Sequence, residues 1–492
     1  MVTFFIALAL LIGGYLIYSR VSEKVFAIDN RKTPAIANPD GVDITPLPRW
    51  KAFLVELLNI AGTGPIFGAI SGALFGPIVF LWIVLGCILG GAVHDYFSGM
   101  ISSRNNGESI VKLAGKYSGR VIEIIMRVFS IILLILVTAV FVVSPSTLLD
   151  SLTAGNVKAW VWMIIILIYY FVSTIVPIDK IIGKIYPVFG IILIVMAVAV
   201  IIGVMVQSNN YPMLELIGNL RDFSKENGSL PWWPFMMTTV ACGAVSGFHA
   251  TQSPMIAKCI KSEKEGRKVF YGAMISESVI ALVWAAAGVA FYGTTQLLND
   301  ALKSGASNVV YEIATGVLGV FGGVLAIAGV IVCPITSGDT AFRSARLIVA
   351  ESVKSDQKEI LNRIFITIPI LAIGGLLTWF AISDDNGFQT IWRYFSWSNQ
   401  TLAMIALWVA TSYLIKKCKY RYGSLLTALP ATFMSGVSMT YILIAEEGLE
   451  LSPSIAYPVG VAFAVILFII YVIVWWRYVF RKKEISNDDN AL

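Results

Sequence analysis

Long apolar stretches alternate with short polar segments along the whole chain. A stretch of about 17 to 25 apolar residues is long enough to cross the hydrocarbon layer of a bilayer as a helix. The pattern predicts about thirteen such helices, at residues 2–19, 54–74, 76–100, 122–143, 159–177, 184–206, 234–258, 268–292, 316–336, 361–382, 394–415, 422–446 and 454–478. We therefore expect an all-α polytopic membrane protein.

Two of these predicted helices contain glycine and proline near their middle. The runs are AGTGPIFGAISG at residues 61–72 and GFHATQSP at residues 247–254. Backbone that leaves a helix at membrane depth is tolerated mainly where it lines a cavity or is packed in protein. Because Pro65 and Pro254 each suit the first turn of a new helix, we expect the chain to unwind near 62–65 and 247–253.

A restarted helix also needs an N-cap, and Thr63 or Gly64 in the first run and Ser253 in the second are suited to that role. The alternative for either run alone is close helix packing, since GxxxG-like spacing such as Gly68 to Gly72 often marks a tight contact. The occurrence of both runs, five predicted helices apart, favours two broken helices.

Charged residues are few and unevenly placed. The chain of 492 residues is 57% hydrophobic and 13% charged, unlike an ordinary soluble domain. Lys and Arg gather after every second predicted helix and in the C-terminal tail, which predicts an inner or plasma membrane protein with its N-terminus outside and its C-terminus cytoplasmic. The cluster KSEKEGRK at 261–268 fits this orientation signal better than a lipid or partner site. The net charge of +6 therefore indicates a lipid bilayer as partner and requires no nucleic acid, while the oligomeric state stays unknown.

With this orientation, the two interrupted helices run in opposite directions and each opens a unit of five helices. This order is typical of inverted-repeat transporters, whose broken helices hold substrate and ions near the midplane. The expected organisation is an N-terminal helix with a cytoplasmic linker (1–53), inverted repeat 1 (54–206), an extracellular loop (207–233), inverted repeat 2 (234–415), and two C-terminal helices with a cytoplasmic tail (416–492).

Residues at the two interruptions form the predicted substrate site. They are Asn59, Gly62, Thr63, Gly64, Gly247, Phe248, His249, Thr251, Gln252 and Ser253. Neither interruption contains Lys or Arg. We therefore expect a carboxylate to bind at the half-helix N-termini, where free N–H groups and the helix dipole favour an anion.

Ionisable residues inside the predicted helices are candidates for ion coupling and gating, because a charge buried in lipid is costly unless it faces a cavity or a partner. His249 can take up a proton near neutral pH or bind substrate, or it can be structural. Glu56 and Asp95 are further coupling candidates, followed by Glu277. His94 and Asp95 lie near the cytoplasmic side as gating candidates or structural anchors. As neighbours about 100° apart on a helix, these two cannot share one face, and each could reach a different network.

Hydroxyl-bearing residues lie close to the cytoplasmic end of the predicted helix at 316–336. In the LeuT-like inverted-repeat fold this region faces the unwound first helix, so Thr336, Ser337 and Thr340 can supply oxygen ligands to a coupling cation. We expect Thr336 and Ser337 to lie near the carbonyls of Asn59 to Gly62. The alternative is that Ser337 or Asp339 caps a short surface helix, and Asp339 is also a gating candidate.

Several other functional classes lack support in the sequence. The chain contains neither a GxxxxGK[ST] phosphate loop nor a TVGYG-like filter, which argues against ATP hydrolysis by that route and against a potassium channel. The five cysteines follow no metal-ligand spacing, so no metal or other cofactor is expected. Ser246 and His249 lie three residues apart, but a hydrolase would also need an oxyanion hole. A nutrient receptor without transport is the other alternative.

Four longer motifs resemble one known family. They are LLNIAGTGPIFGAISGALFGP (57–77), LGCILGGAVHDYFSGM (85–100), CGAVSGFHATQSP (242–254) and CPITSGDTAFRSARLI (333–348). Over about the central two thirds of the chain, the sequence resembles the carbon starvation protein CstA family. The resemblance implies an importer of the amino acid, polyamine and organocation superfamily that takes up peptides or pyruvate when carbon is scarce.

Together these observations predict a LeuT-like 5+5 inverted repeat with one extra N-terminal and two extra C-terminal helices. They also predict a secondary active importer of a small carboxylate, with pyruvate ahead of peptides. The resemblance favours H+ as the coupling ion, and the hydroxyls near residue 336 leave Na+ open.

Overall fold

The computed structural model describes residues 1–41, 43–175, 182–221, 223, 231–384 and 387–488, and these residues form helices joined by turns and loops, without a β-strand among them. The elements before the second interruption are α1 (Val2–Phe26), α2 (Pro34–Ala37), α3 (Arg49–Ala61), η1 (Gly64–Gly68), α4 (Ala69–Gly72), η2 (Ala73–Phe75), α5 (Ile78–Gly86), η3 (Cys87–Gly91), α6 (Ala92–Arg104), α7 (Ile110–Ser118), α8 (Arg120–Leu152), α9 (Ala159–Ile175), α10 (Ile182–Val206) and α12 (Trp232–Thr239). The remaining elements are α13 (Phe248–Ala257), η4 (Glu263–Glu265), η5 (Arg267–Tyr271), α14 (Gly272–Phe291), α15 (Thr295–Leu302), α16 (Ala306–Val353), α17 (Ile360–Ser383), α18 (Gly387–Lys417), α19 (Leu425–Ile444) and α20 (Pro453–Asp488).

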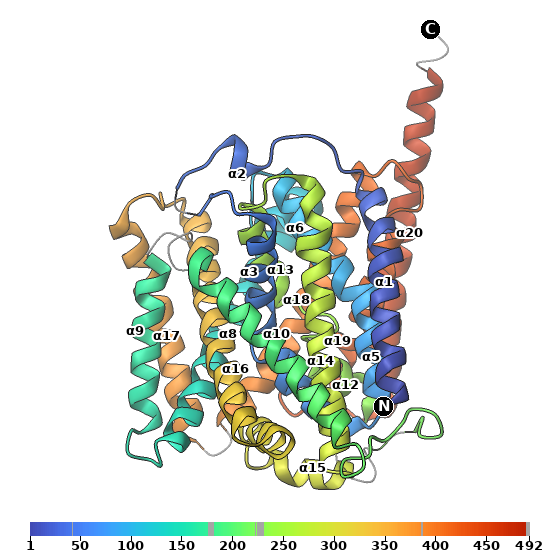
Figure 1. The fold of residues 1–492 in the computed structure, drawn as a ribbon. Helices are drawn as coiled ribbons and strands as arrows, with labels where there is room; N and C mark the ends of the chain where they lie inside the picture. The colour runs from blue at the N-terminus through green and yellow to red at the C-terminus, as the bar shows by residue number, and fades with distance from the viewer. Residues whose placement is uncertain (42, 176–181, 222, 224–230, 385–386, 489–492) are drawn as a thin grey trace.

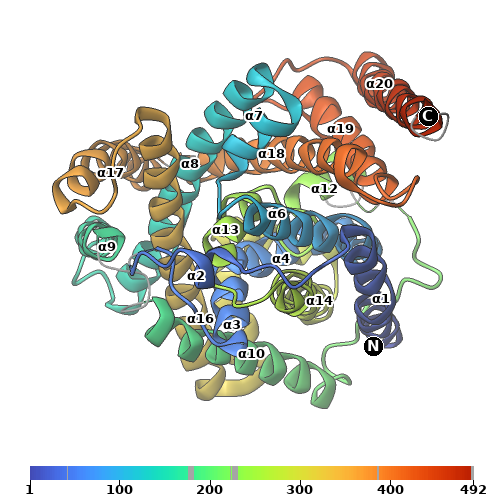
Figure 2. The same ribbon diagram turned by 90° about the horizontal axis from the view of Figure 1, so that it is seen from above.

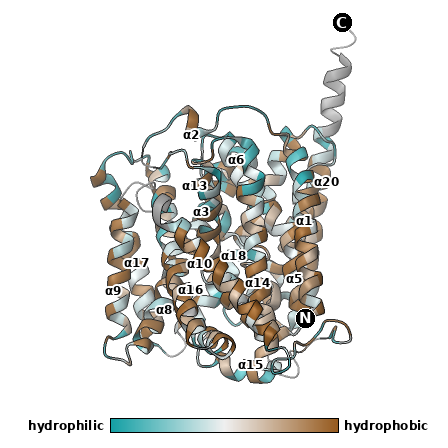
Figure 3. Cartoon of the chain, in the orientation of Figure 1, coloured by the Kyte–Doolittle hydropathy of each residue, from teal (hydrophilic) through white to brown (hydrophobic). Residues whose placement is uncertain are grey.

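The helices form one upright bundle (Figure 1). Within the described part of the chain, nine helices are long and apolar enough to cross a membrane, or up to ten if the bent pair Arg49–Ala61 and Gly64–Phe75 is one span. Figure 3 shows hydrophobic residues along outer helices such as α1, α9 and α20, and more hydrophilic residues in the connecting segments. The predicted all-α polytopic membrane protein is therefore confirmed, and the number of thirteen spans stays a prediction.

Viewed along the bundle, α3, α13 and α14 lie near its middle, whereas α9, α17 and α20 lie at its periphery (Figure 2). The start of α1 and the end of α20 lie at opposite ends of the bundle (Figure 1). The placement of the N-terminus outside and the C-terminus in the cytoplasm stays a prediction.

The first interruption unwinds where the sequence predicts it. The two helical parts meet at an angle of 56°. Gly62 has φ 51 and ψ −144, a conformation that favours glycine, and a Cβ there would lie only 2.4 Å from the Phe141 ring. Thr63 is the N-cap of η1 and Pro65 lies in its first turn, as expected, although the Thr63 side chain makes no capping hydrogen bond.

The second interruption lies earlier than predicted. Residues 240–247 are outside helices, whereas 248–253 belong to α13, so the expected unwinding at 247–253 is wrong. Pro254 lies inside α13 and Ser253 is not its N-cap. The turn falls instead at Gly243, whose φ of +90 is readily available only to glycine.

The helix predicted at 316–336 is much longer in the structure. α16 runs from Ala306 to Val353 with non-helical torsions at Gly319, and together with α15 it makes most of the segment between the helices predicted at 268–292 and 316–336 helical. Ser337 and Asp339 therefore do not cap a short surface helix. The helix continues through this polar run because its side chains are buried against neighbouring helices that supply hydrogen-bond partners.

Candidate functional site

The two interruptions pack against each other through glycine. A Cβ added at Gly64 would lie 2.3 Å from Cys242 Sγ, and one at Gly68 would lie 2.8 Å from the Thr239 carbonyl oxygen. These distances leave no room for a side chain, so the small residues of the first run permit the close approach of the second. The two alternatives for the first run therefore hold together: its glycines allow close packing, and the partner that they pack against is the second interruption.

Side chains of α18 satisfy the backbone of the second interruption. Gln400 Nε2 donates to the carbonyls of Met237 at 2.9 Å and Val245 at 3.2 Å. Asn399 Oδ1 accepts from the Phe248 N–H at 2.7 Å and from the Ser246 hydroxyl at 3.2 Å. Buried backbone groups outside a helix need such partners, so α18 stabilises the unwound form.

Sequence analysis did not select Asn399 or Gln400. The signal was present as the run SNQT at 398–401 inside an apolar stretch. The structure also places the Ser246 hydroxyl against Asn399, and no Ser246–His249 hydrogen bond joins the two residues among the described contacts.

Asp95 joins both histidines of the chain in one buried cluster. Its Oδ2 lies 2.8 Å from His249 Nδ1, and its Oδ1 lies 2.8 Å from His94 Nδ1. The structure therefore places His94 and Asp95 in one network rather than in two. The two oxygens of the Asp95 carboxylate have different partners, so one side chain reaches both its neighbour His94 and His249 on α13.

Two further carboxylates complete this coupling cluster, which we define as Glu56, His94, Asp95, His249 and Glu277. Glu277 Oε2 lies 3.5 Å from His249 Nε2, and both side chains are fully buried. Glu56 Oε1 accepts a hydrogen bond of 2.8 Å from Ser253. The cluster thus draws on α3, α6, α13 and α14, which come from separate parts of the chain.

The geometry around His249 fits a group that gains and loses a proton. With its Nδ1 hydrogen directed at Asp95, a neutral imidazole presents a lone pair from Nε2 to Glu277. A proton on Nε2 or on the Glu277 carboxyl makes this contact attractive, whereas two acceptors without a proton between them repel. One proton can therefore be exchanged at this contact.

Polar atoms at the first interruption remain available to a ligand. Asn59 Oδ1 and Nδ2 and Thr63 Oγ1 are buried and have no hydrogen-bond partner among the described residues. Phe141 and Phe248 form an edge-to-face pair, with ring centroids 6.0 Å apart, against Gly62. Unsatisfied polar atoms beside aromatic rings are typical of a small-molecule site.

The other predicted substrate residues have mainly local partners. Thr251 donates to the Phe248 carbonyl at 2.6 Å, and Gln252 donates to Thr251 at 2.8 Å. Gln252 Oε1 has no partner within the described chain. Ser253 contacts Glu56, so it belongs with the coupling cluster by position.

Residues of α16 divide between two environments. The Ser337 hydroxyl donates to the Leu58 carbonyl at 2.6 Å, one residue before the predicted range Asn59–Gly62, whereas Thr336 and Thr340 bond to carbonyls of their own helix. Asp339 is buried and accepts from Ser173 at 2.6 Å and from Tyr186. The structure thus brings Ser337 to the first broken helix and places Asp339 between α9 and α10.

Among the described residues, one group of side chains has donor atoms close enough to hold a metal ion. The ligand atoms of Cys242, His249 and Glu277 all lie within 4.8 Å of one another and are buried. The sequence predicted no metal, and this spacing alone does not test that prediction. All five cysteines are free thiols.

Comparison with known proteins identifies the family. The family model described as carbon starvation protein CstA matches residues 1–161, 144–299 and 294–441. The chain belongs to the carbon starvation protein CstA family. This membership confirms the resemblance predicted from the four motifs and makes the protein a membrane transporter rather than an enzyme.

Relatives within the CstA family have different names. An uncharacterized membrane protein of Haemophilus influenzae is 43% identical over 62% of this chain and 95% of its own length. The peptide transporter CstA of Campylobacter jejuni is 25% identical over 91% of this chain and 81% of its own. The pyruvate/proton symporter BtsT of Escherichia coli is 27% identical over 54% of this chain and 45% of its own.

Solved structures resemble this chain in fold but not in sequence. A manganese transporter of Eremococcus coleocola superposes with a TM-score of 0.58 at 12% identity, covering 89% of this chain and 99% of that one. A Na+-coupled sialic acid symporter gives a TM-score of 0.51 at 13% identity, covering 94% and 96%. These neighbours are LeuT-fold transporters, so this CstA-family chain has secondary transporters as its structural relatives.

Proposed function

We propose that the protein imports a small carboxylate, with pyruvate ahead of peptides, by proton symport. The observation that carries this proposal is the contact of His249 with Asp95 at 2.8 Å and with Glu277 at 3.5 Å, at the place where two broken helices meet. A transporter couples two solutes when the binding of one changes the site of the other. The first interruption packs directly against the second, so the His249 contacts adjoin the proposed substrate site.

Proton coupling requires that the proton affinity of the cluster differ between the two access states. In the buried form, His249 lies between two carboxylates and is shielded from solvent. Opening the bundle on either side would hydrate these groups and change the balance of charges around the imidazole. A gradient of protons can then favour one access state over the other.

Substrate recognition is assigned to the first interruption and the start of α13. Asn59 and Thr63 offer buried polar atoms without a partner, and the Phe248 N–H opens α13. A carboxylate that replaced Asn399 at this N–H would accept a charge-assisted hydrogen bond at a helix N-terminus. Pyruvate has one carboxylate and one carbonyl oxygen for these donors.

Peptide import is the second candidate because relatives named peptide transporter CstA align with most of the chain.

The proposal also includes the orientation in the membrane: the start of α1 lies outside and the end of α20 lies in the cytoplasm. The division into repeats at 54–206 and 234–415 is likewise part of the proposed mechanism.

Uptake into proteoliposomes tests the proposed function. Purified protein is reconstituted, and labelled pyruvate or a labelled dipeptide is added with an imposed proton or sodium gradient. Accumulation of pyruvate that depends on the proton gradient supports the proposal, whereas accumulation of dipeptide alone supports the second candidate. Binding without accumulation under every gradient would contradict both and favour a receptor.

A further inference from the structure

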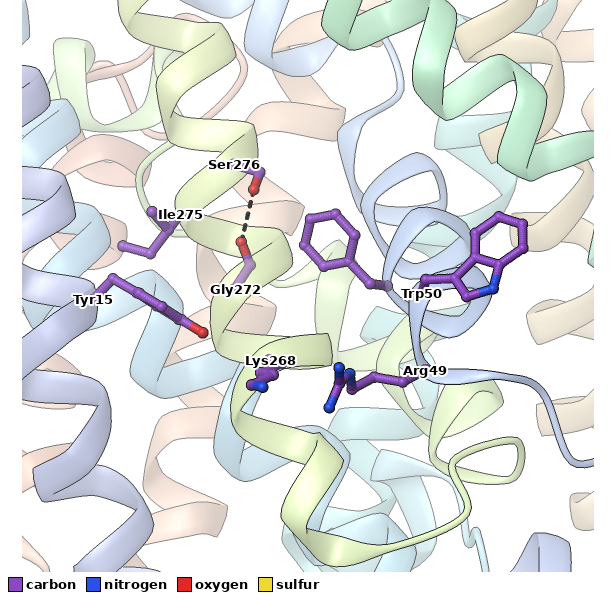
Figure 4. Close-up of a pocket in the computed structure, with 8 residues that line it drawn as sticks. Tyr15, Arg49, Trp50, Lys268, Gly272, Ile275 and Ser276 are labelled. Atoms are coloured by element: carbon purple, nitrogen blue, oxygen red, sulfur yellow. Dashed lines mark hydrogen bonds between the residues drawn. The ribbon is translucent and has the colours of Figure 1, made fainter.

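A basic and aromatic pocket lies between α1, α3, η5 and α14, and none of its lining residues belongs to the coupling cluster. Its volume is about 330 Å³, and its lining residues are Tyr15, Arg49, Trp50, Phe53, Lys268, Gly272, Ile275 and Ser276. Figure 4 shows the side chain of Arg49 extending toward Lys268, with the Tyr15 ring on the α1 side. Two cations therefore share one wall of the pocket.

The two cations have no carboxylate partner in the described chain. Neighbouring basic residues differ in this respect, since Arg267 pairs with Glu23 at 3.4 Å and Arg104 pairs with Glu263 at 2.8 Å. Two like charges that face each other without a counter-charge repel, so the pocket favours an anion between Arg49 and Lys268.

The rest of the pocket suits a lipid rather than a free ion. Phe53 and Ile275 supply an apolar wall beside the cations, and Trp50 is 56% exposed. Trp and Tyr are enriched where a membrane meets water, and an apolar wall next to paired cations matches a headgroup with its acyl chain. A soluble anion would use the cations and leave the apolar wall empty.

We propose that this pocket binds an anionic phospholipid. The phosphodiester lies between Arg49 and Lys268, and an acyl chain packs on Phe53 and Ile275. The basic run at 261–268 then has a second role beyond orientation, because its last residue reaches the pocket. A bound lipid contacts both α3 and α14, which carry Glu56 and Glu277, so it holds together two helices of the coupling cluster.

Lipid retention by the purified protein tests the site. Native mass spectrometry is carried out with phosphatidylglycerol, phosphatidylcholine and soluble glycerol phosphate at equal concentrations. We expect phosphatidylglycerol to be retained in preference to phosphatidylcholine, and glycerol phosphate not to be retained. Equal retention of the two lipids, or retention of glycerol phosphate alone, would overturn the proposal.

A matched pair of variants separates the pocket from general surface charge. Arg49→Gln with Lys268→Gln is expected to weaken phosphatidylglycerol binding about thirty-fold, since each basic side chain near an anionic lipid contributes on the order of fivefold. The control, Arg20→Gln with Lys264→Gln, removes the same charge at exposed positions outside the pocket and is expected to bind normally. Equal loss in both double variants would refute the site.

The single variant Lys268→Gln serves if the double variant does not fold, because Lys268 is exposed and has no ion pair within the described residues. A loss of about fivefold is expected. Unchanged binding in this folded variant would contradict a role for Lys268 in the pocket.

Discussion

His249→Gln tests the proposed coupling most directly. Glutamine keeps an amide that can donate to Asp95, which lies 2.8 Å from His249 Nδ1, but it cannot titrate. The variant should therefore bind and exchange pyruvate while it loses uphill accumulation driven by protons. The contact with Glu277 at 3.5 Å can no longer exchange a proton with the residue at position 249.

The size of the effect follows from the number of protons at this contact. One exchangeable proton per pyruvate anion makes the cycle electrically neutral, so only the pH difference drives accumulation. One pH unit corresponds to about 1.4 kcal/mol, or about a tenfold concentration ratio. Wild-type proteoliposomes with an exterior one unit more acidic should accumulate pyruvate about tenfold, whereas His249→Gln should reach a ratio of about one.

The assay compares accumulation with exchange in the same proteoliposomes. His94→Gln is the matched control, because it makes the same substitution on the other side of Asp95. It is expected to alter the rate and to retain the tenfold ratio. If His249→Gln still concentrates pyruvate about tenfold at the normal rate, the reasoning is refuted, and Glu56, Asp95 and Glu277 become the remaining candidates.

Substitutions at three further positions have expected outcomes. Ser253→Ala removes the 2.8 Å hydrogen bond to buried Glu56, and a loss of about 1–3 kcal/mol in stability should appear as a lower melting temperature. Ser253→Thr keeps the hydroxyl and should retain most of the wild-type stability. Ser337→Ala frees the Leu58 carbonyl and should weaken any sodium-stimulated uptake, so unchanged sodium dependence would remove Ser337 from ion binding. Asp43 in the loop before α3 is buried, which disfavours its charged form, but Arg343 at 2.9 Å and its neighbours outweigh this and hold the pKa of Asp43 below its usual value. The contribution of ionised Asp43 to the free energy of unfolding should therefore be complete above about pH 4 and be lost as the pH falls through the lower folded-state pKa. Asp43→Asn should lower the melting temperature at pH 7 and remove this part of the acid dependence of stability.

The positions of most helices were accessible from the sequence because hydrophobic length is a local property. The span predicted at 361–382 corresponds to α17 at Ile360–Ser383, and that at 184–206 corresponds to α10 at Ile182–Val206. Family membership was accessible for a similar reason, since long motifs are read directly from the chain. The first break was also predictable, because Gly62 permits a positive φ and Pro65 lacks the N–H that a continuous helix would use.

The second break required the tertiary structure. The sequence around Pro254 permits a restart there, yet the chain unwinds at 240–247, because Asn399 and Gln400 on a distant helix satisfy its backbone groups. Local glycine and proline indicate where unwinding is permitted. Partners from elsewhere in the fold determine where it is stable.

The coupling cluster was likewise predictable from the sequence only in part. Composition and span positions identified Glu56, His94, Asp95, His249 and Glu277 as ionisable residues in apolar sequence. Their mutual contacts depend on how α3, α6, α13 and α14 pack, and no periodicity within one helix encodes a distance to another. The sequence by itself therefore determined which groups require partners in the membrane, and only the tertiary structure decided that Asp95 joins both histidines, because burial pairs charged groups across helices.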